Sequence, residues 1–213
     1  MPQKRILLEP EHTYHIWTHA NGSENLFRCE ENFRYFLRRY QHHLYSVIET
    51  FAYCLMPNHL HLMVRVRKEE DILKFVSQKK KKTINLGGLE DLRGLCRTTI
   101  SQQFSNLFNS YTKAYNKKYD RKGSLFIPNF RRKLIDSDEY FVRLIAYIHN
   151  NPVHHGFVAK PSDWQFSSWH AYLMDKNTKI STKEAMNWFG SNTNFEAIHQ
   201  EFNHAEMNAI FEK

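Results

Sequence analysis

Two histidines separated by one residue, His59 and His61, are the side chains of this chain best suited to metal chemistry. They belong to the segment YCLMPNHLHLMVRV (53–66), which is typical of a strand preceded by a turn. Successive side chains of a strand point to opposite faces, so the two histidines share one face while Leu60 and Leu62 face the core. Two imidazoles side by side on a rigid element suit two ligands of one metal ion. A solvent-facing pair with no ligand role is the alternative.

Tyr147 and Asn151 are four residues apart in a predicted helix that begins after residues 137–139, so they share a face one turn apart. A tyrosine hydroxyl is a nucleophile in few reactions, among which phosphodiester transesterification stands out. A divalent ion held by two imidazoles and the Asn151 amide oxygen would polarise the scissile phosphate. The alternatives are a half-buried helix aromatic for Tyr147 and a helix C-cap for Asn151. The cap follows from Pro152, which predicts that the helix ends near Asn150 or Asn151.

The elements that must position these residues can be predicted from apolar periodicity. We expect strands at 14–19, at 46–55 and from residue 59, a tight turn at 56–58, and one or two short strands within 124–135. We expect an amphipathic helix at 29–42, a long helix with Thr99 as its N-cap, a short helix around 169–173, and two final helices separated by 190–192. Strand, helix, strand, turn, strand is the beginning of an α+β sandwich, with helices packed on one sheet face and the other face open.

Residues 68–98 differ from the rest, because they contain the lysine run 79–82 and Gly87-Gly88 with little sustained periodicity. We interpret them as an insertion in the core fold. The predicted organisation is a catalytic domain over 1–175 that carries this insertion, and a helical C-terminal tail over 176–213.

The composition favours a polyanionic partner. Thirty Lys and Arg against 22 Asp and Glu give a net charge of +8 and an isoelectric point near 9.3, and nucleic acid is the commonest polyanion. A basic protein with no such partner is the alternative. The candidate phosphate-binding residues cluster before and after Gly123: Lys117, Lys118, Arg121, Lys122, Arg131, Arg132 and Lys133. Aromatic residues between them could stack on bases or face the core: Tyr115, Tyr119, Phe126 and Phe130.

Three widely spaced cysteines and the absence of an apolar leader or spanning segment favour free thiols and a cytoplasmic protein with no membrane partner.

Three segments together resemble a known family. YCLMPNHLHL (53–62) and AYIHNNPVHHG (146–156), followed by DWQFSS (163–168), resemble the single-tyrosine HUH transposases related to insertion-sequence-200 elements, and within them the REP-associated tyrosine transposases. The resemblance runs from about Tyr14 to Leu173 and leaves out the insertion and the tail.

The resemblance implies a ferredoxin-like α+β sandwich with a central antiparallel sheet, helices mainly on one face and a helical C-terminal extension. It implies that His59 and His61 bind Mg²⁺ or Mn²⁺ and that Asn151, with Asn150 as a neighbouring alternative, is the third ligand. It implies that Tyr147 attacks single-stranded DNA, forming a 5′-phosphotyrosine link and a free 3′-hydroxyl. The implied partners are single-stranded DNA and DNA hairpins, and a homodimer stays open.

Two other functions stay open. One is a domesticated regulator that binds DNA hairpins without turnover, which would have no need for His59, His61 and Tyr147 together. The other is a metal-dependent hydrolase that activates water, in which Tyr147 would be incidental. The second lacks an obvious carboxylate base near the histidine pair.

Overall fold

In the computed structural model, residues 6–80, 89–174 and 177–202 are described. The elements are β1 (Thr13–His19), α1 (Glu30–Leu44), β2 (Ile48–Leu55), β3 (His59–Val66), α2 (Glu69–Lys80), α3 (Leu89–Lys118), β4 (Arg131–Ile135), α4 (Asp138–His154), a 3₁₀ turn (Pro161–Asp163), α5 (Trp169–Leu173), α6 (Thr182–Phe189) and α7 (Asn192–Gln200).

One four-stranded sheet in the order β2-β3-β1-β4 organises the molecule, and every pairing is antiparallel. With α1 between β1 and β2 and α3 between β3 and β4, this is the predicted ferredoxin-like α+β fold. The tight turn at 57–58 joins β2 to β3, where the Met56 N–H donates to the His59 carbonyl (2.8 Å). It places the histidine pair at the first residues of β3.

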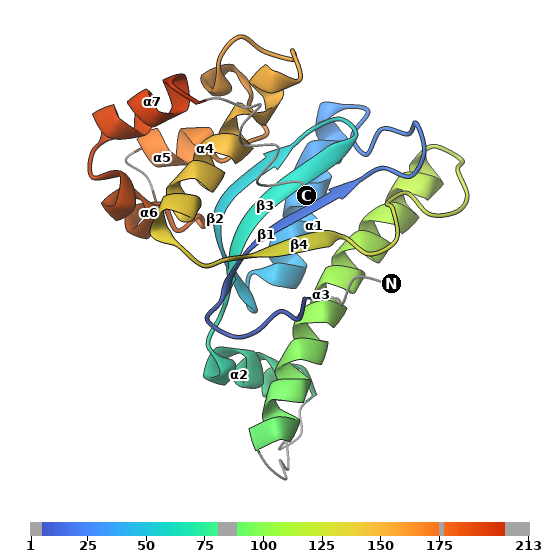
Figure 1. The fold of residues 1–213 in the computed structure, drawn as a ribbon. Coiled ribbons are helices and arrows are strands. Elements are labelled where there is room, and N and C mark those ends of the chain that lie inside the picture. The colour runs from blue at the N-terminus through green and yellow to red at the C-terminus, as the bar shows by residue number, and fades with distance from the viewer. Residues whose placement is uncertain (1–5, 81–88, 175–176, 203–213) are drawn as a thin grey trace, which may run out of the picture.

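The two sheet faces are covered by different helices (Figure 1). On one face, α1 and α3 pack on the apolar side of β3, whose alternate residues Leu60, Leu62 and Val64 are at most 1 % exposed. On the other face, Phe51 and Met63 pack with α4 to α7 in a second core. This face was expected to be open, but helices cover it because it presents apolar residues beside its histidines.

The segment expected to be an insertion is largely helical. α2 occupies 69–80 and packs on α3, with Ile72 fully buried. α3 begins at Leu89, so Thr99 lies inside the helix and is not its N-cap. The buried stripe continues from Ile100 back to Cys96, which behaves as a small apolar residue. Residues 81–88, with Lys81, Lys82 and both glycines, lie outside the described residues.

α4 also runs further than expected. It continues through Pro152 to His154, and His155 is its C-cap. Proline removes one helical N–H, but the last turn is retained because the His155 N–H donates to the Asn151 carbonyl (3.0 Å). Asn151 is therefore a residue of the helix interior and not a cap.

The C-terminal helices were expected, and they pack against α4. Ser191 caps α7, whose Phe195 is fully buried in the second core. The division at residue 175 into a domain and a tail stays a prediction.

Candidate active site

The histidine pair lies on the sheet face that α4 covers. The rings of His59 and His61 have centroids 5.2 Å apart and planes at 89°, so they share one site as the alternation predicted. They are only 3 % and 0 % exposed, whereas we expected a site open to solvent. The difference arises because α4 packs directly over this part of β2 and β3.

Asn151 meets the pair from α4. Its Nδ2–H donates to the Tyr147 carbonyl (3.3 Å), which turns Oδ1 toward His59 Nε2 at 3.3 Å. Asn150 points elsewhere, because its amide donates to the carbonyls of Ala146 and His199. Of the two asparagines that the sequence left open, only Asn151 faces the histidines.

Tyr147 lies one turn before Asn151 and contacts the same rings. Its ring meets His61 edge to face, with centroids 5.5 Å apart. It is fully buried, where the alternative interpretation expected a half-buried aromatic, and Phe202 is among the rings beside it, at 6.2 Å. The four predicted site residues therefore converge, and the phenol is closed off from solvent in the described conformation.

The donor atoms suit a cation. The ring nitrogens of His59 each face an amide oxygen, Asn58 Oδ1 at 2.8 Å from Nδ1 and Asn151 Oδ1 at 3.3 Å from Nε2, and a neutral imidazole has only one N–H. The shorter contact assigns that hydrogen to Nδ1, which leaves a lone pair on Nε2. Burial, with His19 and His155 nearby, lowers the pKa of His59 to about 3, so the ring is neutral near pH 7. Two acceptors, Nε2 and the Asn151 oxygen, then face each other. A divalent ion between them would turn this repulsive contact into two ligand bonds.

The candidate ligands include no carboxylate and no thiolate. Among the described residues there is no group of three or more His, Cys, Asp or Glu arranged to hold a metal. The candidate ligand set is therefore two imidazoles and one amide oxygen, which is the set that the sequence predicted.

Three further imidazoles surround the pair, and sequence reasoning did not connect them with it. His15 Nε2 lies 3.0 Å from His61 Nδ1. His19 stacks on His59, with centroids 4.9 Å apart, and His155 meets His59 edge to face at 4.8 Å. The alternation in β1 indicated that His15 and His19 share a face. What was missing was the pairing of β1 with β3, which places His19 opposite His59.

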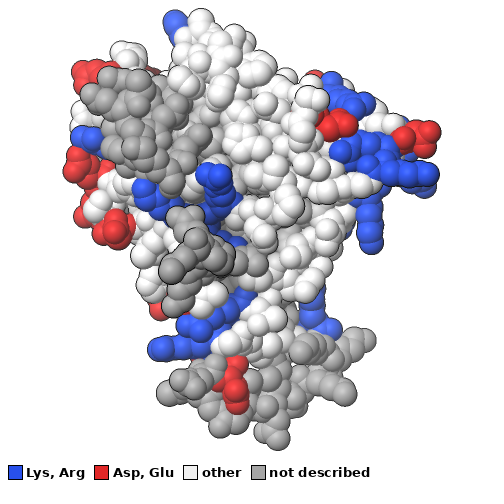
Figure 2. Space-filling model, turned by 45° about the vertical axis from the view of Figure 1, so that its right-hand side comes forward, with Lys and Arg blue, Asp and Glu red and all other residues white. Residues whose placement is uncertain are grey.

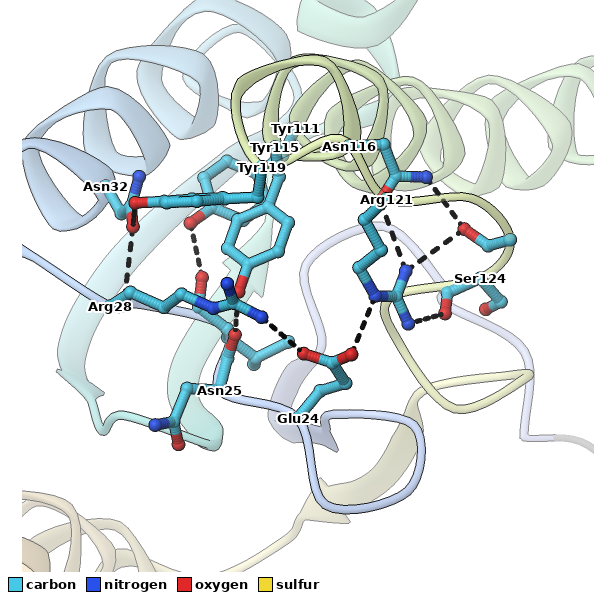
Figure 3. Close-up of polar contacts among 12 residues, drawn as sticks. Glu24, Asn25, Arg28, Asn32, Tyr111, Tyr115, Asn116, Tyr119, Arg121 and Ser124 are labelled. Carbon is cyan, nitrogen blue, oxygen red and sulfur yellow. Dashed lines mark hydrogen bonds and ion pairs between the residues drawn. The ribbon is translucent and has the colours of Figure 1, made fainter.

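The predicted cations divide into two groups. Arg121 is mainly structural: its side chain is 16 % exposed, pairs with Glu24 and donates to the carbonyls of Gly123 and Ser124 (Figure 3). Lys118 pairs with Glu31. Figure 2 shows Asp and Glu among the Lys and Arg at the upper right of the molecule. Lys117 and Lys122 are exposed, and their role in phosphate binding stays a prediction.

The aromatic residues near these cations mostly face the interior. The hydroxyls of Tyr111, Tyr115 and Tyr119 donate to the Leu26 carbonyl, the Asn25 carbonyl and Asn32 Oδ1, tying the 24–32 segment to α3 (Figure 3). Tyr115 and Phe126 are 2 % and 7 % exposed, and Phe130 packs against the first core. In the described conformation, Tyr115 and Phe126 are too buried to stack on DNA bases.

The three consecutive cations of β4 are separated by alternation. Opposite residues in paired strands point to the same face, and Lys133 and Arg131 lie opposite His15 and Trp17. They therefore share the face of the histidine pair, whereas Arg132 lies opposite Ile16 on the face of α1 and α3. Its guanidinium sits over the Phe130 ring at 4.4 Å.

A histidine pair facing a helix tyrosine on a ferredoxin-like sheet matches the arrangement that the sequence resemblance implies. Residues 10–86 match the family model "Transposase IS200 like". This match confirms the resemblance seen in the sequence.

Two known proteins are similar to this chain. A "Putative REP-associated tyrosine transposase" of Haemophilus influenzae is 27 % identical over 122 residues, 57 % of this chain and 59 % of that protein. A solved structure described as a REP-associated tyrosine transposase bound to a REP hairpin has a TM-score of 0.55 at 18 % identity, and covers 81 % of this chain and 86 % of that one. At this identity the structural likeness establishes the fold alone. The chain matches less than two thirds of the curated relative's length. No helix among the described residues is long and apolar enough to cross a membrane.

Proposed function

We propose that this protein is a metal-dependent single-stranded DNA endonuclease and strand transferase that acts at sites next to DNA hairpins. The observation that carries the proposal is the convergence of Tyr147 with His59, His61 and Asn151 on one sheet face. A binding module has no need for a phenol beside two metal-type imidazoles and an amide oxygen. The relative described as bound to a REP hairpin supports the choice of substrate.

In the proposed reaction, the Tyr147 oxygen attacks the scissile phosphorus. A bond forms between the phenol oxygen and phosphorus as the phenol loses its proton, the bond from phosphorus to the 3′-oxygen breaks, and that oxygen takes up a proton, so the step is neutral in protons overall. The 5′ end is then held as a phosphotyrosine ester. Attack by a 3′-hydroxyl on this ester reverses the step and joins strands without an external energy source.

The residues of the site divide the work. His59, His61 and Asn151 would hold Mg²⁺ or Mn²⁺, which supplies positive charge at the non-bridging phosphate oxygens as negative charge develops. Asn58 keeps Nε2 of His59 available through its bond to Nδ1. Arg131 and Lys133 lie on the same face beside β1 and give the incoming backbone two cations. Imidazole ligands favour Mn²⁺ over Mg²⁺.

The test compares wild-type protein with Tyr147→Phe, which removes one oxygen and keeps the ring. Each is incubated with Mn²⁺ and a labelled hairpin oligonucleotide that has a single-stranded extension, then run on a denaturing gel. We expect a covalent adduct with wild type only, and equal hairpin affinity for both. Tyr140→Phe, on the same helix, is the matched control and should form the adduct.

The other outcomes distinguish the alternatives. Hairpin binding by wild type with neither adduct nor cleavage would favour the regulator without turnover. Cleavage that persists in Tyr147→Phe without any adduct would favour the hydrolase that activates water. An adduct that persists in Tyr147→Phe would place the nucleophile at another residue.

A further inference from the structure

His15 of β1 contacts a histidine of the proposed metal pair on the neighbouring strand β3. Its Nε2 lies 3.0 Å from Nδ1 of His61, and both side chains are 0 % exposed. The two ring planes are nearly parallel, at 19°, and their centroids are 5.3 Å apart, so the rings lie edge to edge with the contact between their nitrogens in the ring planes. His15 also stacks on Trp17, with centroids 4.6 Å apart. The β1–β3 pairing, the contact with His61 and the stack on Trp17 therefore fix the position of the His15 ring.

The contact between His15 and His61 decides which nitrogen of His61 can bind a metal. One hydrogen lies between the two nitrogens, and either ring can supply it. If His61 donates from Nδ1, its Nε2 keeps a lone pair and can be a ligand. If His15 donates from Nε2, His61 carries its hydrogen on Nε2 and cannot be a ligand through that atom. The second ring therefore controls the tautomer of the first.

We propose that His15 is a positioning residue that accepts the Nδ1–H of His61 and thereby presents His61 Nε2 to the metal. The inference rests on the proposed function for the metal ion, whereas the hydrogen bond between His15 and His61 is independent of it. It gives both ligands the same kind of support: Asn58 Oδ1 accepts the Nδ1–H of His59, and His15 Nε2 accepts that of His61. Partners of this kind orient a ligand ring and raise its basicity.

The experiment compares His15→Gln, whose side-chain oxygen can accept the same bond, with His15→Leu, which cannot. Long-range ¹⁵N–¹H spectra of the metal-free protein report the tautomer of His61. Titration with Mn²⁺, followed by electron paramagnetic resonance without DNA, reports affinity. We expect Nδ1–H at His61 in wild type and in His15→Gln, and a gain of the Nε2–H form in His15→Leu. Mn²⁺ affinity should fall roughly 10- to 100-fold in His15→Leu and stay near wild type in His15→Gln.

Two controls separate positioning from packing. His19→Leu removes an imidazole from the same face of β1, which stacks on His59, and should leave the His61 tautomer unchanged. Thermal melts of all variants identify loss of folding, and His15→Met replaces His15→Leu if the latter does not fold.

The proposal is overturned if His61 keeps Nδ1–H in the folded apolar variant, or if His15→Gln loses Mn²⁺ affinity as strongly as the apolar variant does. Wild type that shows the expected tautomer but binds no Mn²⁺ would contradict the metal step of the proposed function. The tautomer comparison would still decide the role of His15.

Discussion

At the scale of single residues, the site depends on which atoms the helix turns toward the sheet. Spacing predicted that His59 and His61 share a face and that Tyr147 lies one turn from Asn151. Spacing could not choose between Asn150 and Asn151, because adjacent helix residues differ by about 100° in direction and either could have faced the strand. Nor could it link His15 with His61, since that contact depends on how β1 pairs with β3.

Asn151 gives a prediction at this scale. Asn151→Ala should raise the Mn²⁺ concentration needed for half-maximal cleavage by roughly tenfold or more, the range seen when a group that supports a metal is lost. Asn151→Asp should keep the midpoint near wild type, because a carboxylate is also an oxygen ligand. Asn150→Ala is the matched control, since its amide bonds the His199 carbonyl. It should lower the melting temperature without moving the metal midpoint. An unmoved midpoint in Asn151→Ala would remove Asn151 from the ligand set.

At the scale of elements, α7 is attached to α4 and β2 through a chain of buried polar atoms. His199 Nδ1–H donates to the Phe195 carbonyl (2.6 Å), so His199 Nε2 accepts from His149 Nδ1 (3.0 Å). His149 Nε2 then accepts from the Ser168 hydroxyl (2.7 Å), and Ser168 Oγ accepts from the Tyr53 N–H (2.9 Å). The acceptor roles of His199 Nε2 and His149 Nε2 require both imidazoles to be neutral. The sequence predicted both α4 and α7 but gave no indication of this connection.

The connection predicts acid sensitivity. Burial lowers the pKa of His199 to about 4, below its ordinary value near 6.5, so the unfolded chain takes up the proton first. The resulting stability is complete above pH 6.5 and is lost as the pH falls toward 4, by roughly 3 kcal/mol at about 1.36 kcal/mol per pKa unit. His199→Gln, which does not titrate, should melt lower at pH 7 but lose less between pH 7 and pH 4.5. Equal losses in the two proteins would show that His199 does not titrate in this range.

Two misplaced helix ends have local causes. The sequence ended α4 too early, because a proline usually stops a helix, yet here α4 is held from both sides by β2 and α7. It started α3 too late, because Gly94 and Cys96 interrupt a stripe of large apolar residues. In both cases tertiary packing extends the helix beyond the local signal.

At the scale of the whole molecule, only part of the net charge of +8 lies on the face of the candidate active site. The ion pairs of Arg121 and Lys118 hold loops and helix ends, and Arg132 lies on the face away from the histidines. Of the cations expected from the sequence, Arg131 and Lys133 share the face of the candidate active site. Charge clusters are visible in the sequence, but the face that each member occupies depends on strand alternation and on ion-pair partners.

This division predicts the salt dependence of DNA binding. The double variant Arg131→Ala/Lys133→Ala should lower the slope of log affinity against log salt by about one to two units, since each phosphate contact contributes about 0.7 to 0.9. Lys74→Ala/Lys79→Ala makes the same charge change on α2, away from the histidine face, and should leave the slope unchanged (Figure 1). Hairpin affinity is measured across a salt series. Equal slopes for the two double variants would mean that the DNA backbone does not pass along β4.

The burial of Tyr147 beside Asn151 has a mechanical consequence. The proposed nucleophile and the proposed third ligand belong to one rigid helix, one turn apart, while the histidines belong to the sheet. Any rotation of α4 that carries the phenol toward an incoming phosphate also changes the distance from the Asn151 oxygen to His59. The approach of the nucleophile and the completeness of the ligand set are thus coupled through the orientation of α4. In the proposed reaction, the angle of this one helix on the sheet would govern both.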